Sequence, residues 1–165
     1  MKEIKGNLIG LAKAGDFDVI VHGCNCFCAM GAGIAAEIKE KLPLAYKADL
    51  ATKKGDISKL GTYSQATETM SNGHKVTVIN AYTQYGFGNF GIKLNYERNK
   101  ANPDVLFEYD AFEKILHQLK AEFKGKRIGF PFIGSGLAKG NKVKIDKYIK
   151  AILKDEDVTM VEFQP

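Results

Sequence analysis

The chain has 165 residues, of which 45% are hydrophobic and 26% charged, and its formal net charge at pH 7 is +5. This composition is typical of a folded globular domain, and no apolar run approaches the roughly 18 residues that a membrane-spanning helix needs. The N-terminus, MKEIKGNLIG, lacks the apolar core of a secretion signal. We therefore expect one cytoplasmic domain over residues 1–165, with no membrane partner.

Strand and helix patterns alternate along the chain. Segments rich in β-branched and aromatic residues predict strands at 2–6, 16–23, 61–67, 75–83, 126–134 and 157–164. Helices are predicted at 31–42, from 43 toward Gly55, from an N-cap at Asn102 with Pro103 in the first turn to just before Gly125, and at 142–154. This order predicts an α/β fold with helices on both faces of the sheet.

Ligands in such folds bind beyond the carboxyl ends of the strands, where three loops are expected, at 22–33, 82–93 and 132–142. The first reads HGCNCFCAMGAGIAA from residue 22 to residue 36. Its alternating His22, Cys24, Cys26 and Cys28 would stand in a row on an extended strand rather than surround a tetrahedral ion, so the thiols are better interpreted as packing groups. We predict no metal and no cofactor.

Glycines in the first and third loops favour an anion site. The first loop does not fit a dinucleotide fingerprint, because CNCFCAM separates the strand from the GxGxxA pattern. The third, FPFIGSGLAKGNK, fits neither a Walker loop nor a nucleophile elbow. Backbone N–H groups beside glycines and at helix N-termini attract anions, so the two loops together would hold a diphosphate.

The middle loop, AYTQYGFGNFG, carries four aromatic residues among glycines. These rings would pack either on a ribose or base or on the protein's own core, and both interpretations stay open. His22 is either a structural histidine or an acid, base or nucleophile, and Asn25 has the donor and acceptor needed to bind sugar hydroxyls.

Five stretches occur in an order that resembles the macrodomain family: GNL (6–8), VIVHGCNC (19–26), MGAGIA (30–35), VINAYTQYGFG (78–88) and PFIGSGLAKG (131–140). The resemblance implies a three-layer α/β/α macrodomain with a mixed, about six-stranded sheet and a site for ADP-ribose. The HxCNC form, and the Asn of GNL where most macrodomains have Asp, are most similar to the branch that includes the yeast ADP-ribose 1''-phosphate phosphatase and related phage and bacterial proteins.

The resemblance also implies roles for individual residues. Adenine would be read by Asn7 and the backbone of Leu8, and the distal ribose would lie against Tyr85 or Phe87. The catalytic pair would be His22 and Asn25, with Asn25 orienting the distal ribose. Backbone donors to the diphosphate would come from two segments: Met30, Gly31, Ala32, Gly33 and Ile34 in the first, and Ile133, Gly134, Ser135, Gly136 and Leu137 in the second.

Two departures narrow the implied activity. Macrodomains that release ADP-ribose from acidic side chains typically have an Asp where this chain has Ala35, and a second hydrolase type has an Asp where this chain has Ala138. The implied reaction is hydrolysis of ADP-ribose 1''-phosphate to ADP-ribose and phosphate, so the expected partners are these small molecules.

Three alternatives stay open. The first is a non-catalytic ADP-ribose-binding module, which would keep every binding residue. The second is an ADP-ribosyl hydrolase that acts on protein or nucleic acid through other residues, such as Lys93 or Glu97. The third is an RNA-binding protein. Only two features favour it, namely the aromatic residues and the excess of 24 Lys and Arg over 19 Asp and Glu. Because this excess is modest and is mostly lysine, we do not predict a nucleic-acid partner.

Overall fold

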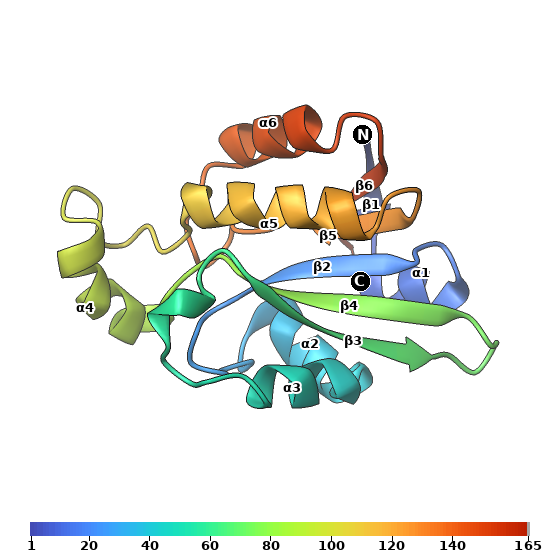
Figure 1. The fold of residues 1–165 in the computed structure, drawn as a ribbon, viewed down its shortest axis with the longest axis horizontal. Coiled ribbons are helices and arrows are strands. Elements are labelled where there is room, and N and C mark those ends of the chain that lie inside the picture. The colour runs from blue at the N-terminus through green and yellow to red at the C-terminus, as the bar shows by residue number, and fades with distance from the viewer. Residues whose placement is uncertain (165) are drawn as a thin grey trace.

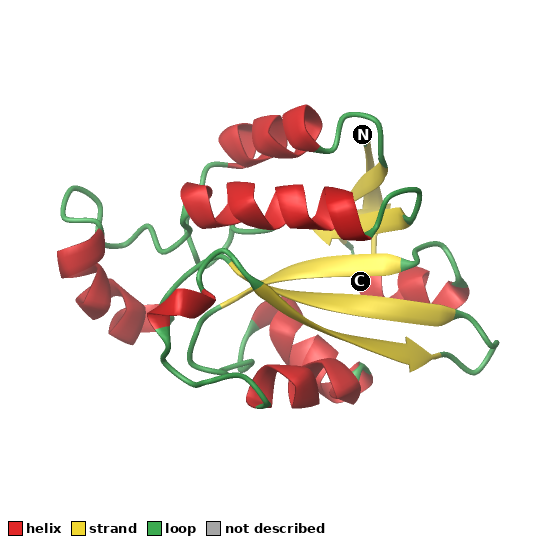
Figure 2. Ribbon diagram, in the orientation of Figure 1, coloured by secondary structure: helices red, strands yellow, loops and turns green. Residues whose placement is uncertain are grey.

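The computed structural model describes residues 1–164 and has three layers, a central sheet between two layers of helices (Figures 1 and 2). The strands are β1 (Lys2–Gly6), β2 (Val19–Cys24), β3 (Tyr63–Thr69), β4 (Lys75–Tyr82), β5 (Arg127–Pro131) and β6 (Asp157–Phe163). They lie in the order β1-β6-β5-β2-β4-β3. Only β3 is antiparallel to its neighbour, so the sheet is mixed and the predicted fold class is confirmed.

Two layers of helices bury the faces of the sheet. The helices are α1 (Leu8–Ala14), α2 (Gly33–Lys41), α3 (Pro43–Leu50), α4 (Gly88–Arg98), α5 (Tyr109–Glu122) and α6 (Lys142–Ile152), with a 3₁₀ turn at Ile57–Lys59. In Figure 1, α5 and α6 cover the upper face, and α1, α2 and α3 cover the lower face. Within residues 1–164, none of these helices is long and apolar enough to cross a bilayer.

Apolar residues on alternate sides of the central strands form the two cores. Val19 and Val21 of β2 join the core under α5 and α6, whereas Ile20 between them joins the core under α1 and α2. A strand that is buried on both faces reads as a continuous apolar run, which is why VIVHGC is recognisable in the sequence.

Helix α5 begins later than predicted. The expected start at Pro103 is wrong, because α5 begins at Tyr109. The preceding residues Leu106 and Phe107 are buried, and their N–H groups donate to the carbonyl of Ala138 at 2.9 and 3.2 Å. These tertiary hydrogen bonds hold the segment out of the helix, so local helix signals are overridden there.

Two helices were not predicted. In α1, Asn7 is the N-cap, and its Oδ1 accepts a 2.9 Å hydrogen bond from the N–H of Gly10. Helix α4 occupies part of the predicted aromatic loop, and its two glycines give it low intrinsic propensity. Gly91 of α4 is nevertheless required, because a Cβ there would lie 2.8 Å from the carbonyl carbon of Gly86.

Candidate functional site

A cavity of about 540 Å³ lies at the carboxyl ends of β5 and β6, between α1, α2 and the loop after β5. Four of the predicted ligand-binding residues line it, namely Asn7, Leu8, Gly33 and Ile34. The other lining residues are Ile9, Glu37, Pro131, Phe132, Val161, Glu162 and Phe163. Such a volume, mostly apolar with a few polar groups, suits a nucleobase with its sugar.

The aromatic and acidic residues of this cavity are not among those that the sequence predicts to bind a ligand. Phe132 lies within the motif PFIGSGLAKG, in which the glycines after it are the stronger local signal for a ligand-binding backbone. Phe163 is 64% exposed and reaches the cavity because β6 pairs with β1, which places Phe163 opposite Gly6. No local pattern predicts such a contact between the two ends of the chain.

The first glycine segment presents open backbone donors beside the cavity. Ala32 is the N-cap of α2 and offers no side-chain acceptor, and the first turn carries no acidic residue. Within residues 1–164, no hydrogen bond leaves the N–H groups of Gly33, Ile34 or Ala35. A Cβ at Gly31 or Gly33 would meet nothing within 4 Å, so a ligand has room to approach this backbone.

The second segment, from Gly134 to Leu137, offers a similar row of donors. In the part of the chain that the structure describes, the N–H groups of Gly134, Gly136 and Leu137 have no acceptor. The Ser135 hydroxyl instead donates back to the carbonyl of Phe132 at 2.9 Å. Ile133 is buried, as is Met30 in the first segment, so their side chains belong to the protein interior.

Gly134 is fixed by geometry rather than by a ligand. Its φ of +73° lies in the left-handed region that disfavours residues with a side chain, and a Cβ there would collide with the ring of Phe107. By contrast, a Cβ at Gly136 would meet nothing within 4 Å. The two glycines of one loop therefore have different physical reasons for being glycine.

His22 lies inside β2 and is only 1% exposed. Its Nε2 is 2.6 Å from Oδ1 of Asn80, which is its register partner on β4. The Nδ2 of Asn80 donates to Ala45 and Ser64, so its Oδ1 must accept and Nε2 of His22 carries the proton. Burial lowers the pKa of His22 to about 4, against a partial opposing effect of the Asn80 hydrogen bond, so the ring is neutral at pH 7.

Asn25 is 7% exposed and is used by its own loop. Its Oδ1 accepts hydrogen bonds from the N–H groups of Phe27 at 2.9 Å and Ala29 at 3.4 Å, and its Nδ2 donates to the carbonyl of Ala29 at 2.9 Å. These bonds make Asn25 the organiser of the turn that follows β2.

The three cysteines are free thiols that serve as packing groups. Cys24 and Cys26 are buried with Met30 and Tyr82, and burial raises the pKa of both thiols, that of Cys26 to about 12. The Cys28 thiol donates to the carbonyl of Asp49 at 3.2 Å. Among residues 1–164 there is no group of three or more His, Cys, Asp or Glu side chains arranged to hold a metal ion.

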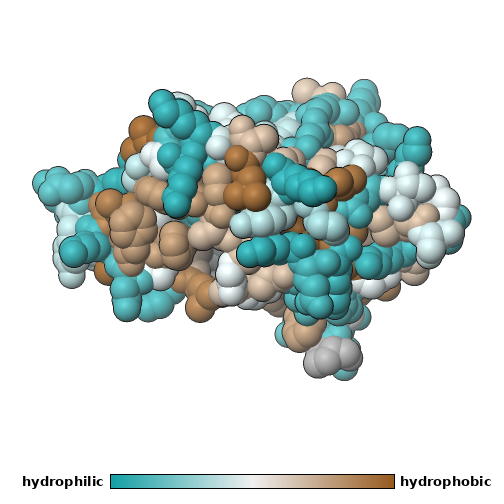
Figure 3. Space-filling view, turned by 90° about the horizontal axis from the view of Figure 1, so that it is seen from below, coloured by the Kyte–Doolittle hydropathy of each residue, from teal (hydrophilic) through white to brown (hydrophobic). Residues whose placement is uncertain are grey.

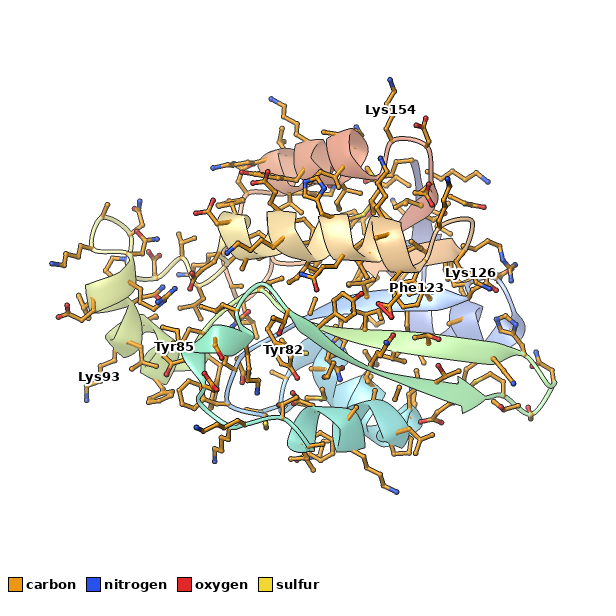
Figure 4. The ribbon with its side chains drawn as sticks, in the orientation of Figure 1. Tyr82, Tyr85, Lys93, Phe123, Lys126 and Lys154 are labelled. Atoms are coloured by element: carbon orange, nitrogen blue, oxygen red, sulfur yellow. The ribbon has the colours of Figure 1, made fainter. Side chains whose placement is uncertain are left out.

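The aromatic residues divide into an inner and an outer group. The ring of Tyr85 is 5.0 Å from that of Phe27, and its hydroxyl donates to the carbonyl of Gly55, so Tyr85 belongs to the protein's own packing. Phe87, next to Phe90, is 41% exposed. In Figure 4 the side chain of Lys93 points away from Tyr85. Figure 3, which shows the molecule from below, has hydrophobic side chains gathered toward the end where α4 lies.

Comparisons with known proteins agree with this architecture, although no protein-family model matches the chain. The uncharacterized 17.5 kDa protein in the tk-vs intergenic region of Enterobacteria phage T4 is 32% identical over 170 residues, which span 100% of this chain and 97% of that protein. The macrodomain of Thermus aquaticus DarG superposes with a TM-score of 0.64 at 17% identity, over 99% of this chain and 97% of that one.

A Trypanosoma brucei macrodomain in complex with ADP-ribose gives a TM-score of 0.59 at 15% identity, over 98% of this chain and 62% of that one. Solved structures at such low identity establish the fold, and the phage relative establishes the sequence family. The chain therefore belongs to the family of the phage T4 17.5 kDa protein and has the macrodomain fold.

Proposed function

We propose that this protein binds ADP-ribose with its base in the cavity and its diphosphate between the two glycine segments, and hydrolyses ADP-ribose 1''-phosphate to ADP-ribose and phosphate. Two sets of backbone N–H groups without an acceptor in residues 1–164 carry the binding proposal. One lies at the start of α2 and the other, at Gly134, Gly136 and Leu137, follows β5. The complex of the Trypanosoma brucei macrodomain with ADP-ribose supports the choice of ligand.

Each part of this ligand would have its own binding region. The apolar cavity beside Leu8 and Phe132 takes the adenosine half. The diphosphate lies between the N–H groups of Gly33 and Gly136, where the positive end of the α2 dipole adds to the attraction. Because no acidic side chain stands in the first turn of α2, nothing in that turn repels the anion.

In the proposed reaction, water attacks phosphorus and the bond between phosphorus and the 1''-oxygen breaks, which releases ADP-ribose and phosphate. Backbone donors would stabilise the charge that develops on the phosphoryl oxygens. The burial of His22 and its bond to Asn80 favour a positioning role, in which the ring fixes the end of β2. Direct contact of His22 or Asn25 with the substrate stays a prediction.

A second candidate function is an ADP-ribose reader without turnover. The observation that favours it is that both sequence-predicted catalytic side chains already have internal partners, Asn80 for His22 and Ala29 for Asn25. A reader would keep the open backbone donors and need no reactive side chain.

Calorimetric titration with ADP-ribose tests binding, and phosphate release from ADP-ribose 1''-phosphate without added metal tests the reaction. We expect Gly136→Val to fill the open space beside this backbone and weaken ADP-ribose binding at least ~10-fold. Ala101→Val adds similar volume at an exposed loop position and serves as the matched control. An intact protein that does not bind ADP-ribose would overturn the proposal.

The turnover results separate the remaining candidates. Phosphate release that persists in His22→Gln supports the positioning role, whereas release that disappears while ADP-ribose affinity is retained makes His22 a catalytic residue. Binding without turnover identifies a reader. Release of ADP-ribose from modified protein or nucleic acid, with no phosphatase activity, identifies an ADP-ribosyl hydrolase.

A further inference from the structure

Asn7 lines the cavity, and its side chain carries a hydrogen-bond donor, Nδ2, that is not used to cap α1. We propose that this cavity accepts a 6-oxopurine, such as hypoxanthine, at least as well as adenine. The inference rests on the proposed function, since it assumes that the cavity holds the base of a nucleoside diphosphate sugar.

The orientation of the Asn7 amide is fixed by α1. Its Oδ1 accepts the hydrogen bond from the N–H of Gly10 at 2.9 Å. A flipped amide would set NH₂ against that N–H, donor against donor, and the helix would lose its cap. The Nδ2 group is therefore the free end of the side chain, and within residues 1–164 it has no acceptor.

A free donor at this place distinguishes the two kinds of purine by the group at C6. The amine of adenine is itself a donor and meets the Nδ2 of Asn7 unfavourably, whereas the carbonyl oxygen of a 6-oxopurine accepts from it. A 6-oxopurine also carries a ring N–H at position 1, which adenine lacks.

A carboxylate that lines the cavity complements that ring N–H. Glu37 of α2 lines the cavity, and among residues 1–164 it is not within 4 Å of a basic group. It is therefore free to accept a hydrogen bond from a ligand. The remaining lining is mainly apolar, including Phe132 and Phe163, and it contacts ring faces that all purines share. Asn7 is therefore the residue that would distinguish an amine from a carbonyl oxygen at C6 of the purine.

Three proteins that all keep an N-cap at position 7 test the inference, namely the intact chain, Asn7→Asp and Asn7→Ser. Each is titrated with ADP-ribose and with its hypoxanthine analogue, inosine diphosphate ribose, and thermal unfolding checks that the three are equally folded. We expect the intact protein to bind the analogue as tightly as ADP-ribose or more tightly. The dissociation constant of the analogue should therefore exceed that of ADP-ribose by no more than about threefold.

The variants give the matched comparison. Asn7→Asp replaces the donor by an acceptor, so the affinity ratio should shift at least ~10-fold toward ADP-ribose. Asn7→Ser keeps the cap but withdraws the side chain from the base, and its ratio should lie between the other two.

Two results would overturn the inference alone: the intact protein binds ADP-ribose but binds the analogue more than ~3-fold more weakly, or Asn7→Asp leaves the ratio unchanged. Failure of all three proteins to bind either ligand would instead overturn the proposed function, and the inference with it.

Discussion

Two neighbouring regions at one edge of the sheet are built in opposite ways. The polar segment from His22 to Cys28 is largely buried, and its polar side chains have partners within the protein. The glycine segments, 31–35 and 134–137, are more open, and several of their N–H groups have no acceptor in the described chain. In this protein the side chains that look reactive stabilise the edge, while the backbone is what remains available for a ligand.

The largest expected effect is at Gly134. Replacement by Ala forces a side chain into the left-handed region and against Phe107, so we expect a loss of about 3 kcal/mol in the free energy of unfolding. Gly136→Ala, in the same loop, should change stability by less than about 0.5 kcal/mol and act only on ligand affinity. Urea unfolding compares the two, and equal losses would contradict the contrast between them.

The next effect is a dependence of stability on pH that comes from His22. Its pKa is about 4 in the folded protein and 6.5 for an unperturbed histidine. As pH falls below 6.5, His22 binds a proton in the unfolded chain but stays neutral in the folded protein. The free energy of unfolding therefore decreases between pH 6.5 and pH 4. From pH 7 to pH 5 the intact protein should lose about 2 kcal/mol more than His22→Gln.

Unfolding curves of both proteins at matched pH measure this difference, and the variant removes the contributions of the carboxylates that the two proteins share. Parallel losses in both would mean that His22 is accessible and charged in the folded state. The ring would then be available to a substrate, and the contrast between the buried segment and the open segments would weaken.

A smaller effect is expected at Asn25. Asn25→Ala removes the acceptor for Phe27 and the donor to Ala29, and should destabilise the protein by about 1.5 kcal/mol. Asn25→Asp keeps the acceptor and should lose less. If Asn25→Ala instead unfolds like the intact protein but fails to bind ADP-ribose in calorimetry, Asn25 is a ligand-contacting residue and the sequence-based role is correct.

The smallest effect is expected at the outer aromatic group. Phe87→Ala should change the free energy of unfolding by less than about 0.5 kcal/mol, because this ring is substantially exposed. Tyr85→Phe is the matched inner variant, and it loses the hydrogen bond to Gly55, at a cost of about 1 kcal/mol. An equal or larger loss in Phe87→Ala would show that the outer ring is part of the core.

Prediction from the sequence succeeded where the signal was local. The apolar run of β2 and the amphipathic spacing of α6 are readable because burial repeats every two or every three to four residues. It failed where the local structure depends on a contact with a residue that is distant in the sequence. The start of α5 depends on Ala138, and the burial of His22 depends on Asn80, 58 residues away.

The candidate site shows the same division. Gly33 and Ile34 line the cavity, and a glycine before a helix is a local signal for exposed N–H groups. That these two residues bind a ligand stays a prediction. Asn7 was also placed there by resemblance, but its use as an N-cap, which decides how its amide points, was not anticipated. Nothing in the local sequence predicts that Phe163 lines the cavity.

The parallel pairing of β1 with β6 has a consequence for synthesis on the ribosome. Residues 2–6 are synthesised long before residues 159–163, with which they pair. The cavity is completed by the same pairing, since Asn7 follows one strand and Phe163 ends the other. A nascent chain in which residues 159–163 have not yet been synthesised therefore lacks this cavity, so the cavity can form only after β6 has paired with β1.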